Sequence, residues 1–163
     1  MAAGRTHDIV NLSILPVAVY YLQPENFTGF ISGYLAGTFL ITPDNDIYHS
    51  RPNRRWKFLR FLWYPYTRIF SHRGISHLPV VGSIAKIVYL VLILAIVTAF
   101  VGFSLQLFLD ISVIKSITDM DKKEIFNIIK SPFVVSFFIG LVLAEIIHVI
   151  TDVVYSSLKK VIR

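Results

Sequence analysis

The sequence predicts an all-α, polytopic membrane protein with about four transmembrane or membrane-embedded helices and a basic, aromatic cytoplasmic loop. Of its 163 residues, 55% are hydrophobic and only 16% are charged, whereas about a quarter of the residues in an ordinary globular domain are charged. So few charges leave too little polar surface to cover a water-soluble domain. The length fits one domain, so we expect residues 1–163 to form a single membrane-embedded unit. The chain has no cysteine, which excludes a disulfide framework, a cysteine-ligated zinc and a thiol nucleophile.

The first two apolar stretches, residues 9–22 and 27–42, flank a polar turn at 23–26 and predict a helical hairpin. With a rise of about 1.5 Å per residue, each helix would cover only about two-thirds of a bilayer core. The sequence therefore leaves open whether these two helices span the membrane fully. Three glycines recur at every fourth residue of the second stretch and predict a smooth face for close helix packing. They are Gly29, Gly33 and Gly37.

The third and fourth helices are predicted over residues 87–109 and 131–158. The third contains no charged residue and is long enough to cross the hydrocarbon core. The fourth carries Glu145, His148 and Asp152, whose spacings of three and four residues place them on one helix face. Because charged groups inside a membrane helix are costly, they normally face a bundle interior and serve a function. A polar cluster that only holds the helices together is the structural alternative.

A concentrated positive loop lies between the second and third helices. Residues 51–73 contain seven Lys and Arg and no Asp or Glu. Because short cytoplasmic loops carry the excess of positive charge, we expect a multi-pass plasma-membrane protein with both termini in the cytoplasm. The aromatic residues of this loop could stack on nucleic acid, but beside transmembrane helices they favour a membrane interface with anionic lipid. We therefore expect a lipid bilayer and no nucleic acid as partner, with an in-plane amphipathic helix around residues 54–66.

All five histidines fall at the same membrane face in this topology, although the topology uses only the apolar runs and the positions of Lys and Arg. Four aspartates fall at that face too. The two sets are His7, His49, His72, His77 and His148, and Asp8, Asp44, Asp46 and Asp152. This grouping indicates a metal or proton site at the cytoplasmic face.

Three short motifs each offer two metal ligands. They are His148-x-x-x-Asp152, Asp44-x-Asp46 and the pair His72 and His77 around a glycine turn. The first places two ligands one helical turn apart, whereas an Asp-x-Asp sequence is equally often a helix-ending turn. Nitrogen and oxygen ligands from separate chain positions suit a divalent metal, zinc first, with manganese or iron as alternatives.

These motifs, in this order, resemble those of a known family. His7, Pro43-Asp44-Asn45-Asp46, His72-Arg73-Gly74-Ile75-Ser76-His77 and His148-x-x-x-Asp152 are similar to a bacterial family of uncharacterised membrane-bound metal-binding proteins. Arg54-Arg55-Trp56 and Trp63-Tyr64-Pro65-Tyr66 resemble one branch of it. A related branch is described as LexA-regulated inner-membrane metal-dependent hydrolases. The His-Arg-Gly-x-Ser-His element is the most specific part of the resemblance.

The resemblance implies a bacterial inner-membrane protein that binds a metal and has hydrolase activity. The implied ligands are His7, Asp44 or Asp46, His72, His77, His148 and Asp152. Two departures bear on the site. His49 does not directly follow Asp46, as a histidine does in some relatives, and Leu78 follows His77 where a small polar residue is common. The ligand role of His49 therefore stays open.

A metal at this face would activate water for hydrolysis. Glu145, or an aspartate such as Asp46 that is left unligated, could act as general base. Arg73 could bind a phosphate group, although it is equally compatible with an ordinary positive-inside residue. The position at headgroup level favours a phospholipid or another amphiphilic phosphoester as substrate. The alternatives are a metal-binding or metal-handling membrane protein without turnover, and a scaffold in which the metal only ties the helices together.

Overall fold

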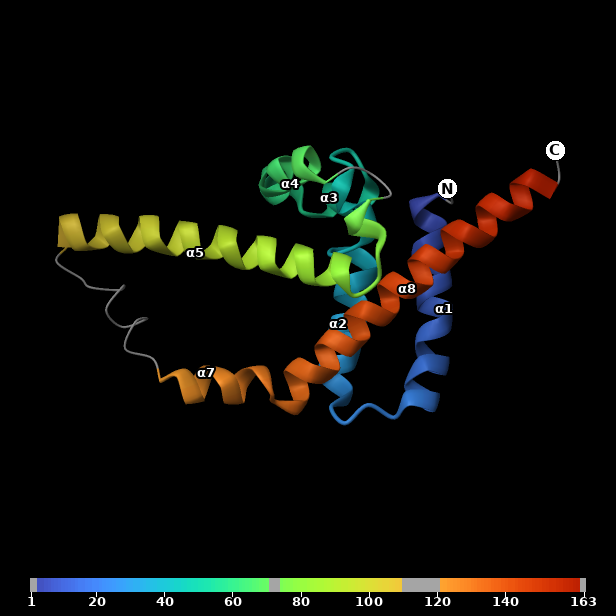
Figure 1. Ribbon diagram of the computed structural model, residues 1–163, viewed down its shortest axis with the longest axis horizontal. Helices are drawn as coiled ribbons and strands as arrows, with labels where there is room; N and C mark the ends of the chain where they lie inside the picture. The colour runs from blue at the N-terminus through green and yellow to red at the C-terminus, as the bar shows by residue number, and fades with distance from the viewer. Residues whose placement is uncertain (1–2, 71–73, 110–120, 162–163) are drawn as a thin grey trace.

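The chain is helical throughout the part that the structure describes. The computed structural model describes residues 3–70, 74–109 and 121–161, and these ranges contain no strand. The four longest helices are α1 (Gly4–Leu22), α2 (Phe27–Phe39), α5 (Val81–Leu109) and α8 (Pro132–Val161) (Figure 1). The shorter segments are η1 (Pro43–Asp46), α3 (Arg51–Arg55), η2 (Lys57–Trp63), α4 (Tyr64–Ile69), η3 (Ile75–His77) and α7 (Lys122–Ile129), where η marks a 3-10 helix.

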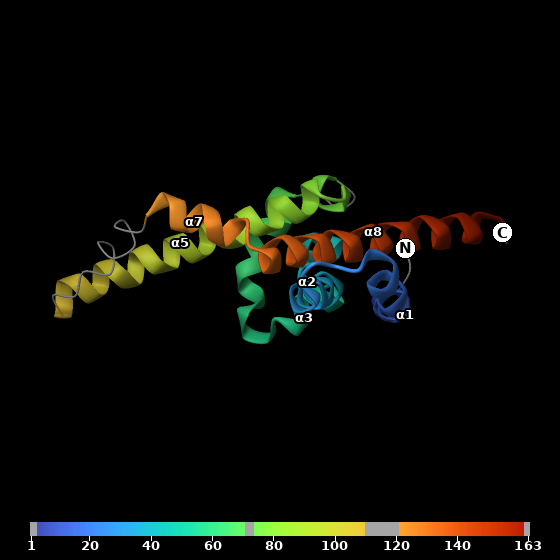
Figure 2. The ribbon, with the colours of Figure 1, turned by 90° about the horizontal axis from the view of Figure 1, so that it is seen from below.

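Helices α1 and α2 form the antiparallel hairpin that the sequence predicts, side by side in both ribbon views (Figures 1 and 2). Gln23 ends α1 in the left-handed conformation, with a φ of 43°. Asn26 caps α2, because its side-chain oxygen accepts a hydrogen bond from the Gly29 N–H at 2.7 Å. The Tyr34 hydroxyl donates to the Asn11 carbonyl at 2.8 Å and ties the two helices together.

Helix α8 packs along α2 almost backbone to backbone. A Cβ atom added at Gly33 would lie 1.9 Å from the Phe137 carbonyl oxygen. A Cβ atom added at Gly140 of α8 would lie 2.2 Å from the Phe30 carbonyl oxygen of α2. No side chain fits at such distances, so the predicted packing role of the glycine face is confirmed.

The buried core lies where α1, α2 and α8 meet, and it is small. It contains Ala18, Phe30, Tyr34, Ala144 and Ile147. Helix α5 extends away from this core, and only 6% of its most apolar window is buried within the chain (Figures 1 and 2). Most apolar side chains of α5 therefore need a cover that the described chain does not provide.

Two helices among the described residues, not four, are long and apolar enough to cross a membrane. They are α5, over Val81–Phe108, and α8, over Pro132–Val161. Helix α2 has 13 residues, which extend only about 20 Å at a rise of about 1.5 Å per residue. The predicted count of about four transmembrane or membrane-embedded helices is therefore corrected to two candidate spans by length and composition.

The basic, aromatic loop forms three short helical segments, α3, η2 and α4, instead of the single in-plane helix expected around residues 54–66. Pro52 and Pro65 stand in the first turns of α3 and α4, where their missing N–H costs nothing. Trp63 and Tyr66 are fully buried and pack against the ring of Tyr89 from α5. The loop is thereby fixed to the start of α5.

Candidate metal centre

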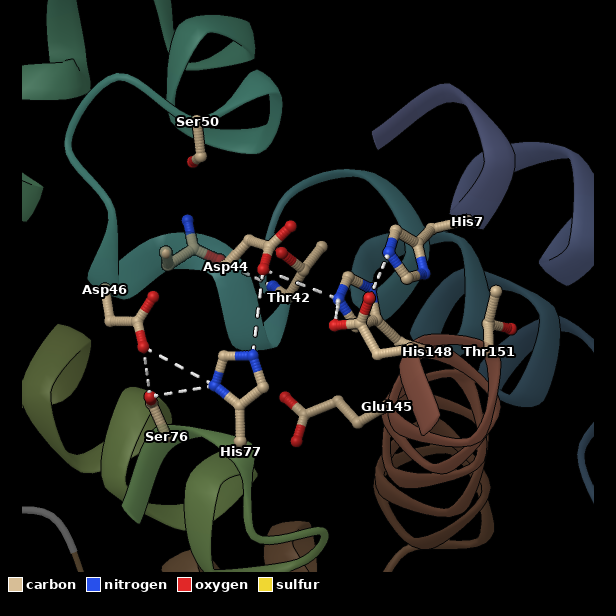
Figure 3. Close-up of polar contacts among 12 residues, drawn as sticks. His7, Thr42, Asp44, Asp46, Ser50, Ser76, His77, Glu145, His148 and Thr151 are labelled. Carbon is tan, nitrogen blue, oxygen red and sulfur yellow. Dashed lines mark hydrogen bonds and ion pairs between the residues drawn. The ribbon is translucent and has the colours of Figure 1, made fainter. Parts of the chain in front are cut away.

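Three separate parts of the chain meet at one cluster of four ligand side chains. Asp44 comes from η1, His77 from η3, and His148 and Asp152 from the C-terminal half of α8 (Figure 3). Each offers one ligand atom, and these atoms all lie within 4.8 Å of one another. The structure thus brings together three motifs that lie far apart in the sequence.

The turn that carries Asp44 is held by buried amide side chains. The Thr42 N–H donates to Asn45 Oδ1 at 2.5 Å, and the Asn45 side chain donates in turn to Asn53 Oδ1 at 2.7 Å. Asn53 Nδ2 donates back to the Asn45 carbonyl at 3.1 Å. Because these side chains satisfy the backbone and each other, the η1 turn holds Asp44 in a defined position.

The spacing of the ligand atoms fits a metal ion better than direct hydrogen bonds. Asp44 Oδ1 lies 3.6 Å from His148 Nε2 and 3.7 Å from His77 Nε2. Asp152 Oδ2 lies 4.0 Å from His148 Nε2. These separations exceed an ordinary hydrogen bond, but two ligand atoms of a tetrahedral zinc ion, each about 2.1 Å from the metal, stand about 3.4 Å apart. The two imidazoles and two carboxylates therefore fit a divalent cation.

His7 joins the edge of this cluster from α1. Its Nε2 atom lies 3.3 Å from Asp152 Oδ1, and its side chain is buried. The structure places it beside the four-ligand cluster and not within it, so its predicted role as a ligand stays a prediction.

The electrostatics favour the metal-binding forms of Asp44 in the cluster and of the neighbouring His7. Burial alone would raise the pKa of Asp44, but His148, with smaller contributions from His7 and His77, holds that pKa below its ordinary value. Burial, followed by the neighbouring His148, lowers the pKa of His7. At neutral pH, Asp44 is therefore an anionic oxygen donor and His7 a neutral imidazole.

Asp46 contacts the far side of the His77 ring. Its Oδ2 atom accepts a hydrogen bond from the Ser76 hydroxyl at 2.6 Å and lies 3.5 Å from His77 Nδ1. His77 Nε2 faces Asp44 instead. This is the arrangement in which a carboxylate orients a metal-binding histidine through the ring nitrogen that does not bind the metal. The geometry is compatible with a positioning role for Asp46, and its predicted roles as ligand and catalytic base stay predictions.

Glu145 lies on the same face of α8 as His148, and its side chain reaches toward His77 (Figure 3). Its Oε1 atom is 2.7 Å from Lys86 Nζ of α5, and both side chains are buried. Lys86 also donates to the Ser76 carbonyl at 3.4 Å. The predicted general base thus has a cationic partner, which sequence reasoning missed because Lys86 lies just outside the apolar run at residues 87–109.

Three other residues considered for the site are not among the members of the cluster that the structure describes. His72 and Arg73 lie outside the described residues. His49 is exposed, and its ring meets the edge of Tyr48. The structure does not bring His49 into the ligand cluster.

A pocket of about 250 Å³ opens beside the cluster and is lined by His77, Asp152, Val149, Val153 and Ser156. Two of these residues are members of the ligand set. A small molecule or a water can therefore approach the cluster from this side.

The fold and this centre define an α-helical protein with a candidate metal site built from histidine and aspartate side chains. The chain belongs to the DUF2227 family of uncharacterized metal-binding proteins, whose model matches residues 2–162. It is also 36% identical over 147 residues to an uncharacterized protein of Aquifex aeolicus (strain VF5), an alignment that covers 85% of this chain and 99% of that protein. No solved structure matches the chain. Family and ligand cluster together support the predicted metal binding.

Proposed function

We propose that this protein is a membrane-bound, metal-dependent hydrolase that acts on a phospholipid or another amphiphilic phosphoester at the cytoplasmic face of a bacterial inner membrane. The observation that carries the proposal is the pocket beside the ligand cluster, which reaches His77 and Asp152. A metal with a purely structural role is enclosed by protein ligands, whereas a catalytic metal keeps an open position. The sequence resembles a metal-binding family of which a related branch is described as LexA-regulated inner-membrane metal-dependent hydrolases, and that description agrees with the proposal.

Asp44, His77, His148 and Asp152 would hold a divalent cation, with zinc favoured and manganese or iron as alternatives. Such a cation supplies a Lewis acid and lowers the pKa of water toward neutrality. Asp46 orients the His77 ring through Nδ1. His7 holds the Asp152 carboxylate through the contact between His7 Nε2 and Asp152 Oδ1. Glu145 accepts the proton of the attacking water, and Lys86 holds its carboxylate in place.

The lining of the pocket favours an amphiphilic substrate. Val149 and Val153 contribute apolar lining, and Ser156 contributes polar lining together with Asp152 and His77. A phosphoester with an alkyl or acyl chain would place its polar group at the ligands and its chain along the valines. Arg73 is proposed to bind the phosphate oxygens, because a guanidinium group matches them in shape and charge.

The first test is the metal content of detergent-purified full-length protein, measured by mass spectrometry for the native chain and for His77→Ala and Asp152→Ala. We expect stoichiometric metal in the native chain and its loss in both variants. His49→Ala is the matched control, because it removes an exposed histidine outside the cluster and should keep the metal.

The second test is turnover by the metal-loaded protein on a panel of phospholipids and short-chain amphiphilic phosphoesters. Metal-dependent release of phosphate or headgroup, abolished in Glu145→Gln, is the expected result. Stoichiometric metal without turnover on any substrate of the panel would instead establish a metal-handling protein. Absence of metal from all variants after addition of zinc or manganese would overturn the proposal.

A further inference from the structure

The 3-10 helix η2 carries a column of exposed aromatic side chains. A 3-10 helix has three residues per turn, so side chains at i and i+3 lie above one another. Phe58 and Phe61 stand in this relation, and Tyr64 follows three residues later. Their side chains are 81%, 59% and 48% exposed. Neighbouring aromatic surface of this kind indicates a binding partner.

Cationic side chains border this column. The Arg60 guanidinium lies over the Tyr48 ring, 4.8 Å from its centroid, and the Arg68 guanidinium lies 5.1 Å from the centroid of Tyr64. Residues 47–109 contain no Asp or Glu, so this part of the chain brings no negative charge to the surface. Exposed aromatic rings at the headgroup level and basic side chains near anionic lipid are the pattern of a membrane interface.

Helix α3, at the start of the same segment, is held next to the metal centre. Asp8, which follows His7 in α1, lies 2.5 Å from Arg55 Nη2 and 3.2 Å from Arg51 Nη1. The hydrogen bonds between Asn45 and Asn53, described above, join α3 to the turn that holds Asp44. The segment and the ligand-bearing turn are therefore coupled as one unit.

We propose that residues 51–69, which we call the basic platform, dock on the surface of an anionic lipid bilayer and hold the metal centre at headgroup depth. A second copy of this chain is a weaker candidate partner. In a two-fold dimer the same surface would face itself, and the platform would oppose its own positive charge. A bilayer with anionic headgroups matches both the aromatic column and the charge.

The absence of cysteine from the native chain makes a site-specific probe possible. Full-length Phe58→Cys protein, labelled with an environment-sensitive fluorophore, is reconstituted in phosphatidylcholine vesicles with and without phosphatidylglycerol. Acyl chains brominated near the headgroup serve as quenchers. We expect strong quenching and a blue shift with phosphatidylglycerol and weak quenching without it. Phe61→Cys, one turn further on, repeats the measurement if the first variant does not fold.

Removal of two platform charges tests the electrostatic part of the proposal. Arg54→Gln with Lys57→Gln removes two exposed cations that are not the partners of Asp8. The ratio of docked to undocked label should fall roughly 30-fold, because each of the two basic residues near an anionic surface contributes about a fivefold factor. The matched control is Lys122→Gln with Lys123→Gln in the exposed helix α7, which should leave the quenching unchanged.

Three results would overturn the proposal. The label could stay in water in both lipid mixtures, or be quenched equally in both. The label could also be shielded from water in detergent, and lose this shielding when the protein is diluted. That result would assign the surface to contact with a second copy of the chain. The measurement needs no turnover, so its failure would leave the hydrolase proposal untouched.

Discussion

The imidazole rings of His7 and His148 are stacked, with centroids 3.7 Å apart and planes inclined by only 7°. The first helix of the chain thereby contacts the last one at the metal centre. Because two protonated rings at this distance would repel each other, the stack disfavours the state in which both rings are charged. Neutral imidazole is the form that binds a metal.

Acidification is therefore expected to destabilise the metal-free protein partly through His7. Burial and then His148 lower the pKa of folded His7, whereas an unfolded histidine titrates near pH ~6.5. As the pH falls through about 6.5, the unfolded state takes up the proton first, so stability present above that pH is lost. Thermal unfolding in detergent with a chelator, followed from about pH 7.5 to about pH 5, measures the loss. His7→Gln cannot titrate and should show a flatter profile, and equal slopes would refute the assignment.

Replacement of Asp46 should weaken metal binding without abolishing it. Asp46→Ala removes the carboxylate beside His77 Nδ1 but leaves the four-member cluster intact. Loss of such an orienting carboxylate typically costs about 10- to 100-fold in metal affinity. Competition with a chromophoric chelator gives the affinity, and Asp44→Ala, which removes a ligand, should lose far more. Equal losses in the two variants would show that Asp46 is itself a ligand.

The buried pair of Lys86 and Glu145 should show strong coupling in a double-mutant cycle. Glu145→Met leaves the Lys86 ammonium buried without its partner, which is expected to cost about 3–5 kcal/mol in the free energy of unfolding. Replacement of both residues by methionine should recover most of that loss. Denaturant unfolding in detergent provides the four free energies. If the losses of the single variants simply add in the double variant, the pair is not coupled in solution.

The same double variant separates structure from chemistry. If Glu145 is the general base, the methionine pair should keep its metal and its stability but lose turnover. Turnover at the native rate would restrict Glu145 to holding α5 against α8.

Gly33→Ala is expected to separate α2 from α8. Its Cβ would lie 1.9 Å from a backbone oxygen of Phe137, and a backbone cannot rotate away as a side chain does. Forced overpacking of this kind costs about 1–3 kcal/mol or more. The control is Gly4→Ala, whose Cβ would have Arg51 Cβ as its nearest neighbour at 3.3 Å, a contact that a shift of a few tenths of an ångström relieves. The thermal midpoints of the two variants in detergent should differ clearly, and similar midpoints would contradict the close packing.

The positions of the helices were predictable because apolar runs and turns are local signals in the sequence. What each helix packs against was not predictable from these signals. The runs at 87–109 and 131–158 locate the two candidate spans that the structure has at Val81–Leu109 and Pro132–Val161. The shorter run at 27–42 predicted a further transmembrane or membrane-embedded helix, yet α2 ends at Phe39, and its glycine face packs on α8. A hydrophobic run alone does not show whether its side chains contact lipid or a neighbouring helix.

The members of the metal cluster were predictable as residue types, whereas their roles depended on contacts between distant segments. The motif spacing indicated Asp44 and Asp46 equally. The structure distinguishes them, because Asp44 faces His77 Nε2 and Asp46 faces His77 Nδ1. No sequence pattern indicated a role for Lys86, since a single lysine at the start of an apolar helix normally extends to the membrane–water interface. Its pairing with Glu145 depends on the crossing of α5 and α8.

The order of the ligands along the chain has a consequence for biogenesis. Asp44 and His77 are synthesised early, but His148 and Asp152 belong to the last helix. A nascent chain that still lacks α8 holds only half of the four-member cluster. If this cluster holds the metal, uptake is expected only after α8 has packed on the glycine face of α2, and a loaded centre would mark a chain whose assembly is complete.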